Sequence, residues 1–80
     1  MKERVKLIWD FRGPNAFPIA QHHAKHLGEF AQAEGLQHSI TGSEQLAEMY
    51  AIAFLVVEKV HMHALREKLK PNRGQLYTEK

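Results

Sequence analysis

The chain has no cysteine among its 80 residues. This absence excludes disulfide bonds, thiolate nucleophiles, iron–sulfur clusters and cysteine-ligated zinc. It is compatible with a reducing compartment. The N-terminal stretch "MKERVKLIWDFRG" is a poor match to a signal peptide, because Asp10 and Arg12 interrupt its apolar run. The sequence therefore predicts a cytoplasmic protein.

Long apolar runs are also lacking. The longest, "AIAFLVV" at residues 51–57, is far shorter than the roughly 20 residues that a membrane helix needs, so we expect no membrane partner. A composition that is 44% hydrophobic and 25% charged is typical of a globular protein, and we expect one domain over residues 1–80. A domain of this size buries only about 60 to 65% of the surface of its unfolded chain, so a second subunit would add stability.

Charge of one sign is scarce, since the net charge is only +2. Residues 1–12 sum to +2, residues 13–57 to −3 and residues 58–80 to +3. The basic ends could steer an anionic partner, but they are weaker than the dense basic patch of a nucleic-acid-binding protein. The charge distribution therefore disfavours a nucleic-acid partner.

The first half of the chain predicts a strand followed by a helix. Residues 4–11, "RVKLIWDF", alternate apolar and polar side chains, which is typical of a strand with one buried side. "RGPN" at 12–15 ends this strand, and a helix follows to about Glu34, where Gly35 provides a stop. The predicted core stripe of this helix consists of Ala16, Ile19, Ala20, His23, Leu27 and Phe30.

The second half predicts two strands, then a helix, then a short final strand. Residues 36–41 indicate a half-buried strand whose inner row is Leu36, His38 and Ile40, with "GSEQ" at 42–45 as a tight turn. From about Glu48 a third strand is apolar at both parities, so either of two rows could face the core. A helix over 59–70 and a short strand over 74–80 follow. The two rows are Met49, Ala51, Ala53 and Leu55, and Tyr50, Ile52, Phe54 and Val56.

The resulting order, β-α-β-β-α-β, predicts an α+β, ferredoxin-like sandwich with two helices on one face of an antiparallel sheet. An alternative keeps the first strand and places a long two-helix hairpin after it, with residues 43–70 as one helix that Ser43 would cap. The β-branched and aromatic residues of "YAIAFLVV" favour the strand.

The third strand also predicts a homodimer. One of its apolar rows would be left exposed in a lone sandwich, and exposed apolar patches commonly mark interfaces, so we expect open sheet faces or edges to pack together. The alternative is that C-terminal residues fold over that face within one chain.

Three histidines in "QHHAKH" at 21–26 make the first helix rich in histidine. His22 and His26 lie one turn apart with Glu29 near the same stripe, and these three are the candidate ligands for a metal. No HExxH pattern supports them, so the favoured interpretation is solvated residues beside the apolar stripe. We accordingly expect no metal and no cofactor.

Two further sets of residues are candidate binding sites. His23 and His38 could meet beneath Trp9 in a buried, proton-sensitive pocket, although core histidines usually have partners within the protein. Arg12 and Asn15 could receive an anion at the first turn of the helix. A salt bridge from Asp10 or Arg12 to a neighbour is the simpler account of that loop, since no glycine-rich phosphate motif is present.

These observations favour a small homodimeric binding or regulatory protein, of unspecified ligand, over an enzyme, because no nucleophile and base are recognisable. The alternatives are a small enzyme of the dimeric ferredoxin-like type that uses the pocket of Trp9, His23 and His38, and a protein that binds single-stranded RNA. RNA binding is disfavoured because Trp9 and Phe11 belong to the buried row and the third strand lacks the Lys/Arg-Gly start of the RNP1 signature.

Overall fold

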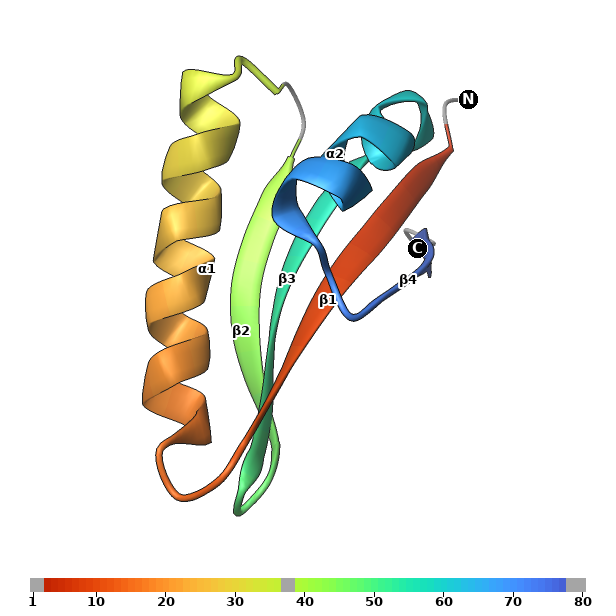
Figure 1. The fold of residues 1–80 in the computed structure, drawn as a ribbon. Helices are drawn as coiled ribbons and strands as arrows, with labels where there is room; N and C mark the ends of the chain where they lie inside the picture. Colours follow the sequence, from red (N-terminus) through yellow and green to blue (C-terminus); the bar gives the residue numbers. More distant parts are fainter. Residues whose placement is uncertain (1–2, 37–38, 78–80) are drawn as a thin grey trace.

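A computed structural model describes residues 3–36 and 39–77 of the chain. Within these residues four strands form one antiparallel sheet, in the order β2-β3-β1-β4. Both helices pack on the same face of this sheet (Figure 1). The elements are β1 (Arg4–Arg12), α1 (Ala16–Ala33), β2 (Ile40–Ala47), β3 (Tyr50–Glu58), the 3-10 turn η1 (Lys59–His61), α2 (Met62–Leu69) and β4 (Arg73–Tyr77).

This architecture confirms the α+β class and the two helices on one sheet face. The alternative of a helix over residues 43–70 is wrong, because β2 and β3 occupy most of the first half of that range. The extended backbone suits β3, where β-branched and aromatic side chains can pack on both faces of the sheet. No helix in the described part of the chain is long and apolar enough to span a membrane.

The strand and turn predicted over residues 36–45 are shifted from their true positions. β2 begins at Ile40, the predicted turn lies inside this strand, and the chain reverses at Glu48 and Met49 instead. Ile40 pairs with Val56 on the side away from the helices, whereas Thr41 lies on the helix side, where its hydroxyl is close to Gly28 of α1. His38, assigned to the inner row of this strand, lies outside the described residues.

Gly42 explains why a sequence that reads as a turn runs through a strand. It pairs with Phe54, and the Phe54 ring covers it so closely that a Cβ atom at Gly42 would lie 2.7 Å from Phe54 Cζ. Glycine is therefore needed for the close approach of this ring, and it does not mark a turn.

The main core lies between the helices and one face of the sheet. It receives Val5, Leu7 and Trp9 from β1, and Leu65 from α2. The helix α1 contributes mostly small side chains, and the buried ones are Ala16, Ala20, Ala24, Leu27 and Ala31. Ile19 was predicted in this stripe but is 50% exposed, because the centre of the stripe passes through the alanines. Alanine at these positions lets the backbone of the helix approach the sheet closely.

The opposite side of the sheet has no helix on it, and we call it the helix-free face. It is formed by the alternate residues Arg4, Lys6, Ile8, Asp10 and Arg12 of β1, Ile40, Gly42 and Glu44 of β2, Tyr50, Ile52, Phe54, Val56 and Glu58 of β3, and Arg73, Gln75 and Tyr77 of β4. The row of β3 that faces the helices is therefore the one containing Ala51, Ala53 and Leu55.

The helix-free face is less exposed than the sequence predicts. Ile52 is only 4% exposed and Val56 is fully buried, so the expectation that this whole row would be left open in one chain is wrong. Tyr50 and Phe54 remain half-buried. The C-terminal strand β4 does not fold over this face, because it pairs beside β1 at the edge of the sheet. The face itself carries the long side chains of Lys6 and Arg12, which lie over the rings of Phe54 and Tyr50.

Candidate functional site

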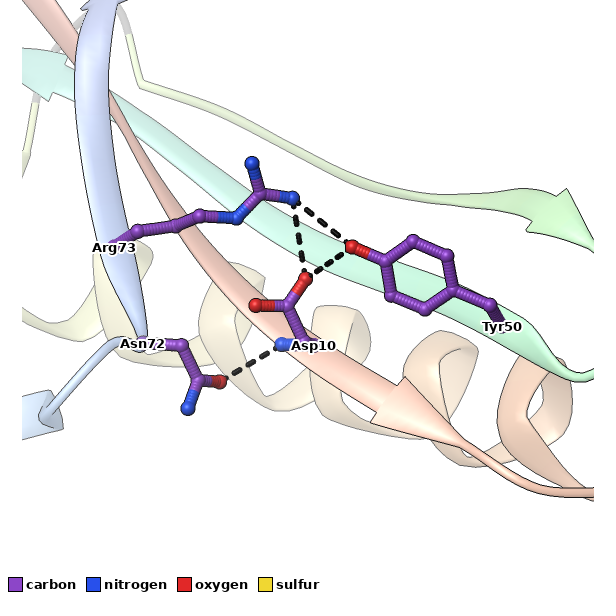
Figure 2. A network of polar contacts seen from close by, with 4 residues as sticks. All are labelled: Asp10, Tyr50, Asn72 and Arg73. Carbon is purple, nitrogen blue, oxygen red and sulfur yellow. Dashed lines mark hydrogen bonds and ion pairs between the residues drawn. The ribbon is translucent and has the colours of Figure 1, made fainter.

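A polar cluster on the helix-free face joins three strands around one carboxylate. The Tyr50 hydroxyl donates a hydrogen bond to Asp10 Oδ1 at 2.5 Å, and Arg73 Nη2 lies 3.1 Å from both the same Oδ1 and the Tyr50 oxygen. Asn72 completes the cluster, since its Oδ1 accepts the Asp10 backbone N–H at 2.8 Å. Figure 2 shows Arg73 reaching from β4 across β1 toward the tyrosine of β3.

The register of the sheet brings these residues together. Asp10 pairs with Ile52, one position of the same row away from Tyr50, while Arg73 pairs with Ile8 on the other side of β1. The carboxylate therefore lies between a phenol and a guanidinium on the same face of adjacent strands. Such diagonal neighbours are within reach of long and aromatic side chains.

The electrostatics of this cluster stabilise charge and do not activate a nucleophile. The hydrogen bond from Tyr50 and the ion pair with Arg73 lower the pKa of Asp10 from its ordinary value, despite partial burial that acts in the opposite direction. The hydrogen bond to Asp10 raises the pKa of Tyr50. At neutral pH the carboxylate is therefore ionised and the phenol keeps its proton, so the cluster acts as an anchor between strands.

Cations lie against the aromatic rings of the same face. The Arg12 guanidinium carbon is 4.2 Å from the centre of the Tyr50 ring, and Lys6 Nζ is 4.4 Å from the centre of Phe54. Arg4 lies over Tyr77 at 5.5 Å. These distances are typical of cation–π contacts, which join neighbouring side chains of the helix-free face.

The predicted anion site is divided by the fold. Arg12 is directed to Tyr50 on the helix-free face. Asn15 is the residue that precedes the first turn of α1, and its side chain makes no capping hydrogen bond. Asp10 does form a salt bridge, to Arg73, as the simpler account of this loop proposed.

The candidate pocket residues Trp9 and His23 lie in contact on the helix-covered face. Their ring centres are 5.1 Å apart, and Phe11 flanks His23 at 5.5 Å. Trp9 Nε1 donates to the Leu69 carbonyl at 3.1 Å, whereas the buried His23 Nε2 has no hydrogen-bond partner among the described residues. Burial, followed by the neighbouring His26, lowers the pKa of His23. His23 is thus held neutral beside two aromatic rings.

The metal candidates lie on the exposed side of α1. His22 Nε2 and His26 Nε2 are 2.9 Å apart, and His26 Nδ1 is 3.4 Å from Glu29 Oε1. The sequence therefore placed these three residues together correctly. In residues 3–36 and 39–77 no group of three or more histidine or carboxylate side chains is arranged to hold a metal ion.

Sequence reasoning missed the cluster of Asp10, Tyr50 and Arg73. Its members are 40 and 63 positions apart along the chain, counted from Asp10. The available signal was the polar row of β1, in which Asp10 is an acidic residue among the cations Arg4, Lys6 and Arg12. A buried or half-buried charge on a strand usually has a partner on a neighbouring strand.

Comparison of the chain with protein-family models, with curated proteins and with solved structures finds no match. The class of this protein is therefore described from its fold and its contacts alone. They describe an α+β protein with a helix-covered core on one side of an antiparallel sheet and a polar-aromatic surface on the other.

Proposed function

We propose that this chain is a homodimeric binding protein without catalytic activity, and that a second copy packs on the helix-free face. One observation carries the proposal. Tyr50 and Phe54 lie on the inner strand β3, half-buried on the same face as the buried apolar residues Ile8, Ile52 and Val56. Aromatic rings surrounded by arginine are typical of the centre of protein interfaces.

The charges of this face favour a second copy over RNA. Arg4, Lys6, Arg12 and Arg73 stand against Asp10, Glu44 and Glu58, so the described residues of this face carry an excess of only one positive charge. A face with both signs can complement itself across a two-fold axis. A nucleic acid binds best to a strongly positive surface, and three carboxylates oppose it.

The proposal includes a ferredoxin-like topology and a cytoplasmic location. The order β-α-β-β-α-β, the strand order β2-β3-β1-β4 and the helices on one face support the topology. A two-layer sandwich of this kind leaves one sheet face free for a partner. A chain without cysteine has no disulfide bonds that the reducing conditions of the cytoplasm could break. Subunit association can add the stability that disulfides give small secreted domains.

The experiment measures molar mass by size-exclusion chromatography with light scattering, on untagged protein over a range of concentrations. The monomer mass is 9.2 kDa, and we expect the wild type to have twice that mass. Phe54→Glu places a charge at the centre of the helix-free face and should give a monomer. Val60→Glu is the matched control, because Val60 is 80% exposed and lies in η1, outside the paired strands of the sheet.

A wild type that remains a monomer at every concentration would contradict the proposal, as would a dimer that Phe54→Glu leaves intact. Circular dichroism establishes that both variants fold. Fluorescence anisotropy with a mixed-sequence single-stranded RNA then tests the rival partner. Binding that is lost in Phe54→Glu and retained in Val60→Glu, by a wild type that stays monomeric, would assign this face to RNA instead.

A further inference from the structure

We propose that His22 and His26 form a two-imidazole chelate for a divalent transition-metal ion on the exposed side of α1. In the folded chain the two Nε2 atoms are 2.9 Å apart, and the rings meet edge to face with their centres 4.5 Å apart. Residues four positions apart lie one above the other on a helix, which aims both side chains at the same patch of solvent.

The distance between the two nitrogen atoms indicates which metal the pair suits. Metal–imidazole bonds are about 2.0 to 2.1 Å long, so two of them at a right angle place their nitrogen atoms about 2.9 Å apart. A tetrahedral angle separates them by about 3.3 to 3.4 Å with the same bond lengths. A hydrogen bond holds the metal-free pair at 2.9 Å, and a square-planar or octahedral ion can bind both nitrogen atoms at this separation, whereas a tetrahedral ion requires the two rings to move apart. Cu(II) and Ni(II) prefer such geometries, and Cu(II) binds nitrogen ligands most tightly of the divalent series.

Glu29 orients one of the two ligands and is not itself a third ligand. Its Oε1 lies 3.4 Å from His26 Nδ1, on the side of the ring away from the Nε2 that faces His22. A carboxylate beside Nδ1 favours the tautomer that carries its proton there and leaves Nε2 free for a metal. In the metal-free chain His22 Nε2–H then donates to His26 Nε2. On metal binding His22 moves its proton to Nδ1, and two nitrogen–metal bonds replace this hydrogen bond.

The rest of α1 allows metal to bind without a change in the fold. His22 and His26 are exposed, whereas Ala20, Ala24 and Leu27 of the same helix point into the core. The core holds the helix, so the two histidines remain one helical turn apart on the same side of α1 whether or not metal is bound. The chelate also lies on the opposite layer of the molecule from the helix-free face, so it is independent of the proposed dimer (Figure 1).

The test uses untagged protein purified without metal-affinity resin, titrated with CuCl2 and, separately, NiCl2 by isothermal calorimetry. We expect one Cu(II) per chain in the wild type, and a loss of affinity of about tenfold or more in His22→Ala and in His26→Ala. The matched control is His63→Ala, because His63 is a 90% exposed histidine on α2 and should leave affinity unchanged. Glu29→Gln should weaken binding less than loss of either histidine.

Thermal unfolding provides a second readout that a general surface affinity would not give. A metal that binds only the folded helix raises the unfolding temperature, so NiCl2 should stabilise the wild type and His63→Ala but neither single variant. Alanine is a good helix former, and both variants are expected to fold. Equal Cu(II) affinity in the wild type and the His22→Ala/His26→Ala double variant would overturn the proposal. So would a loss in His63→Ala as large as that in His26→Ala.

Discussion

The two faces of this sheet bury similar side chains by different means. On one face Leu7 and Leu55 are fully buried beneath two helices. On the other face Val56 is fully buried and Ile8 and Ile52 nearly so, although no helix lies above them. The same face carries aromatic rings and long charged side chains, which the Asp10 cluster and cation–π contacts join to one another.

The comparison teaches that burial does not by itself identify a core. Each helix is stiffened by its own backbone hydrogen bonds, so it covers the sheet as one unit and can shift only as a whole. Lysine and arginine side chains lie on apolar surface but keep their charged ends in water, so they can shift to fill a gap or give way to a partner. We therefore expect the helix-free face to be the softer of the two, and four predictions sharpen this comparison.

The largest effect is expected from truncating matched aliphatic residues of β3 on the two faces. Leu55→Ala leaves a cavity beneath the helices and should lower the free energy of unfolding by about 3 to 4 kcal/mol. Ile52→Ala, on the face without helices, should cost about 2 kcal/mol, because neighbouring side chains can partly fill the cavity. Urea unfolding measures both. Equal losses would show that the two faces are packed with the same rigidity.

A substitution that adds volume to the helix-free face is expected to have the next largest effect. In Gly42→Ala the new Cβ would lie 2.7 Å from Phe54 Cζ, so the ring must move. We expect a loss of about 1 to 2 kcal/mol in urea unfolding. Gly28→Ala in α1 is the comparison, since a Cβ atom at Gly28 would lie 3.3 Å from the Thr41 hydroxyl oxygen. A neutral Gly42→Ala would mean that the Phe54 ring moves freely.

Removing the charge of Asp10 should weaken the contacts with Tyr50 and Arg73 that join three strands on the helix-free face. Asp10→Asn should cost about 1 kcal/mol at neutral pH, discounted for solvent around the ion pair. Because the pKa of Asp10 is lower in the folded chain, its contribution is present above the ordinary value of 3.8 and is lost as the pH falls through the folded value. Denaturant midpoints of both proteins at pH 7 and near pH 3 should therefore differ less at the lower pH.

The smallest effect concerns His23 on the rigid face. Its pKa is lowered in the folded chain, so the unfolded chain takes up a proton more readily. Neutral His23 makes its full contribution to the free energy of unfolding above the ordinary pKa of 6.5, and this contribution declines as the pH falls below that value. His23→Gln should reduce the loss of stability between pH 7 and pH 5.5, because glutamine takes up no proton in this range. An unchanged pH profile in His23→Gln would contradict this assignment.

Local pattern accounts for the elements that were predicted well. β1 alternates with period two, and α1 ends where Gly35 adopts a positive φ of 67°. The helix predicted over 59–70 appears as η1 and α2, with Leu65 buried as its periodicity indicates. β2 was misplaced because it is a mostly exposed edge strand with little apolar alternation of its own.

The candidate sites divide in the same way. His22, His26 and Glu29 belong to one helix, and their helical spacing was enough to predict that they meet. The contact between Trp9 and His23 could be predicted because it requires only that β1 and α1 pack together through their apolar sides. The contacts of Asp10 with Tyr50 and Arg73 depended on which strands are neighbours and in which register.

The sequence by itself determined the class of the fold, the inward row of β1 and the histidine pair, because the periods of strands and helices act over a few residues. Only the tertiary structure decided the register of β2, the need for Gly42 under Phe54, and the cover of the helix-free face. Those features depend on side chains that are distant in the chain and meet only when the sheet is complete. Their positions follow from the packing of the whole molecule, which no local pattern records.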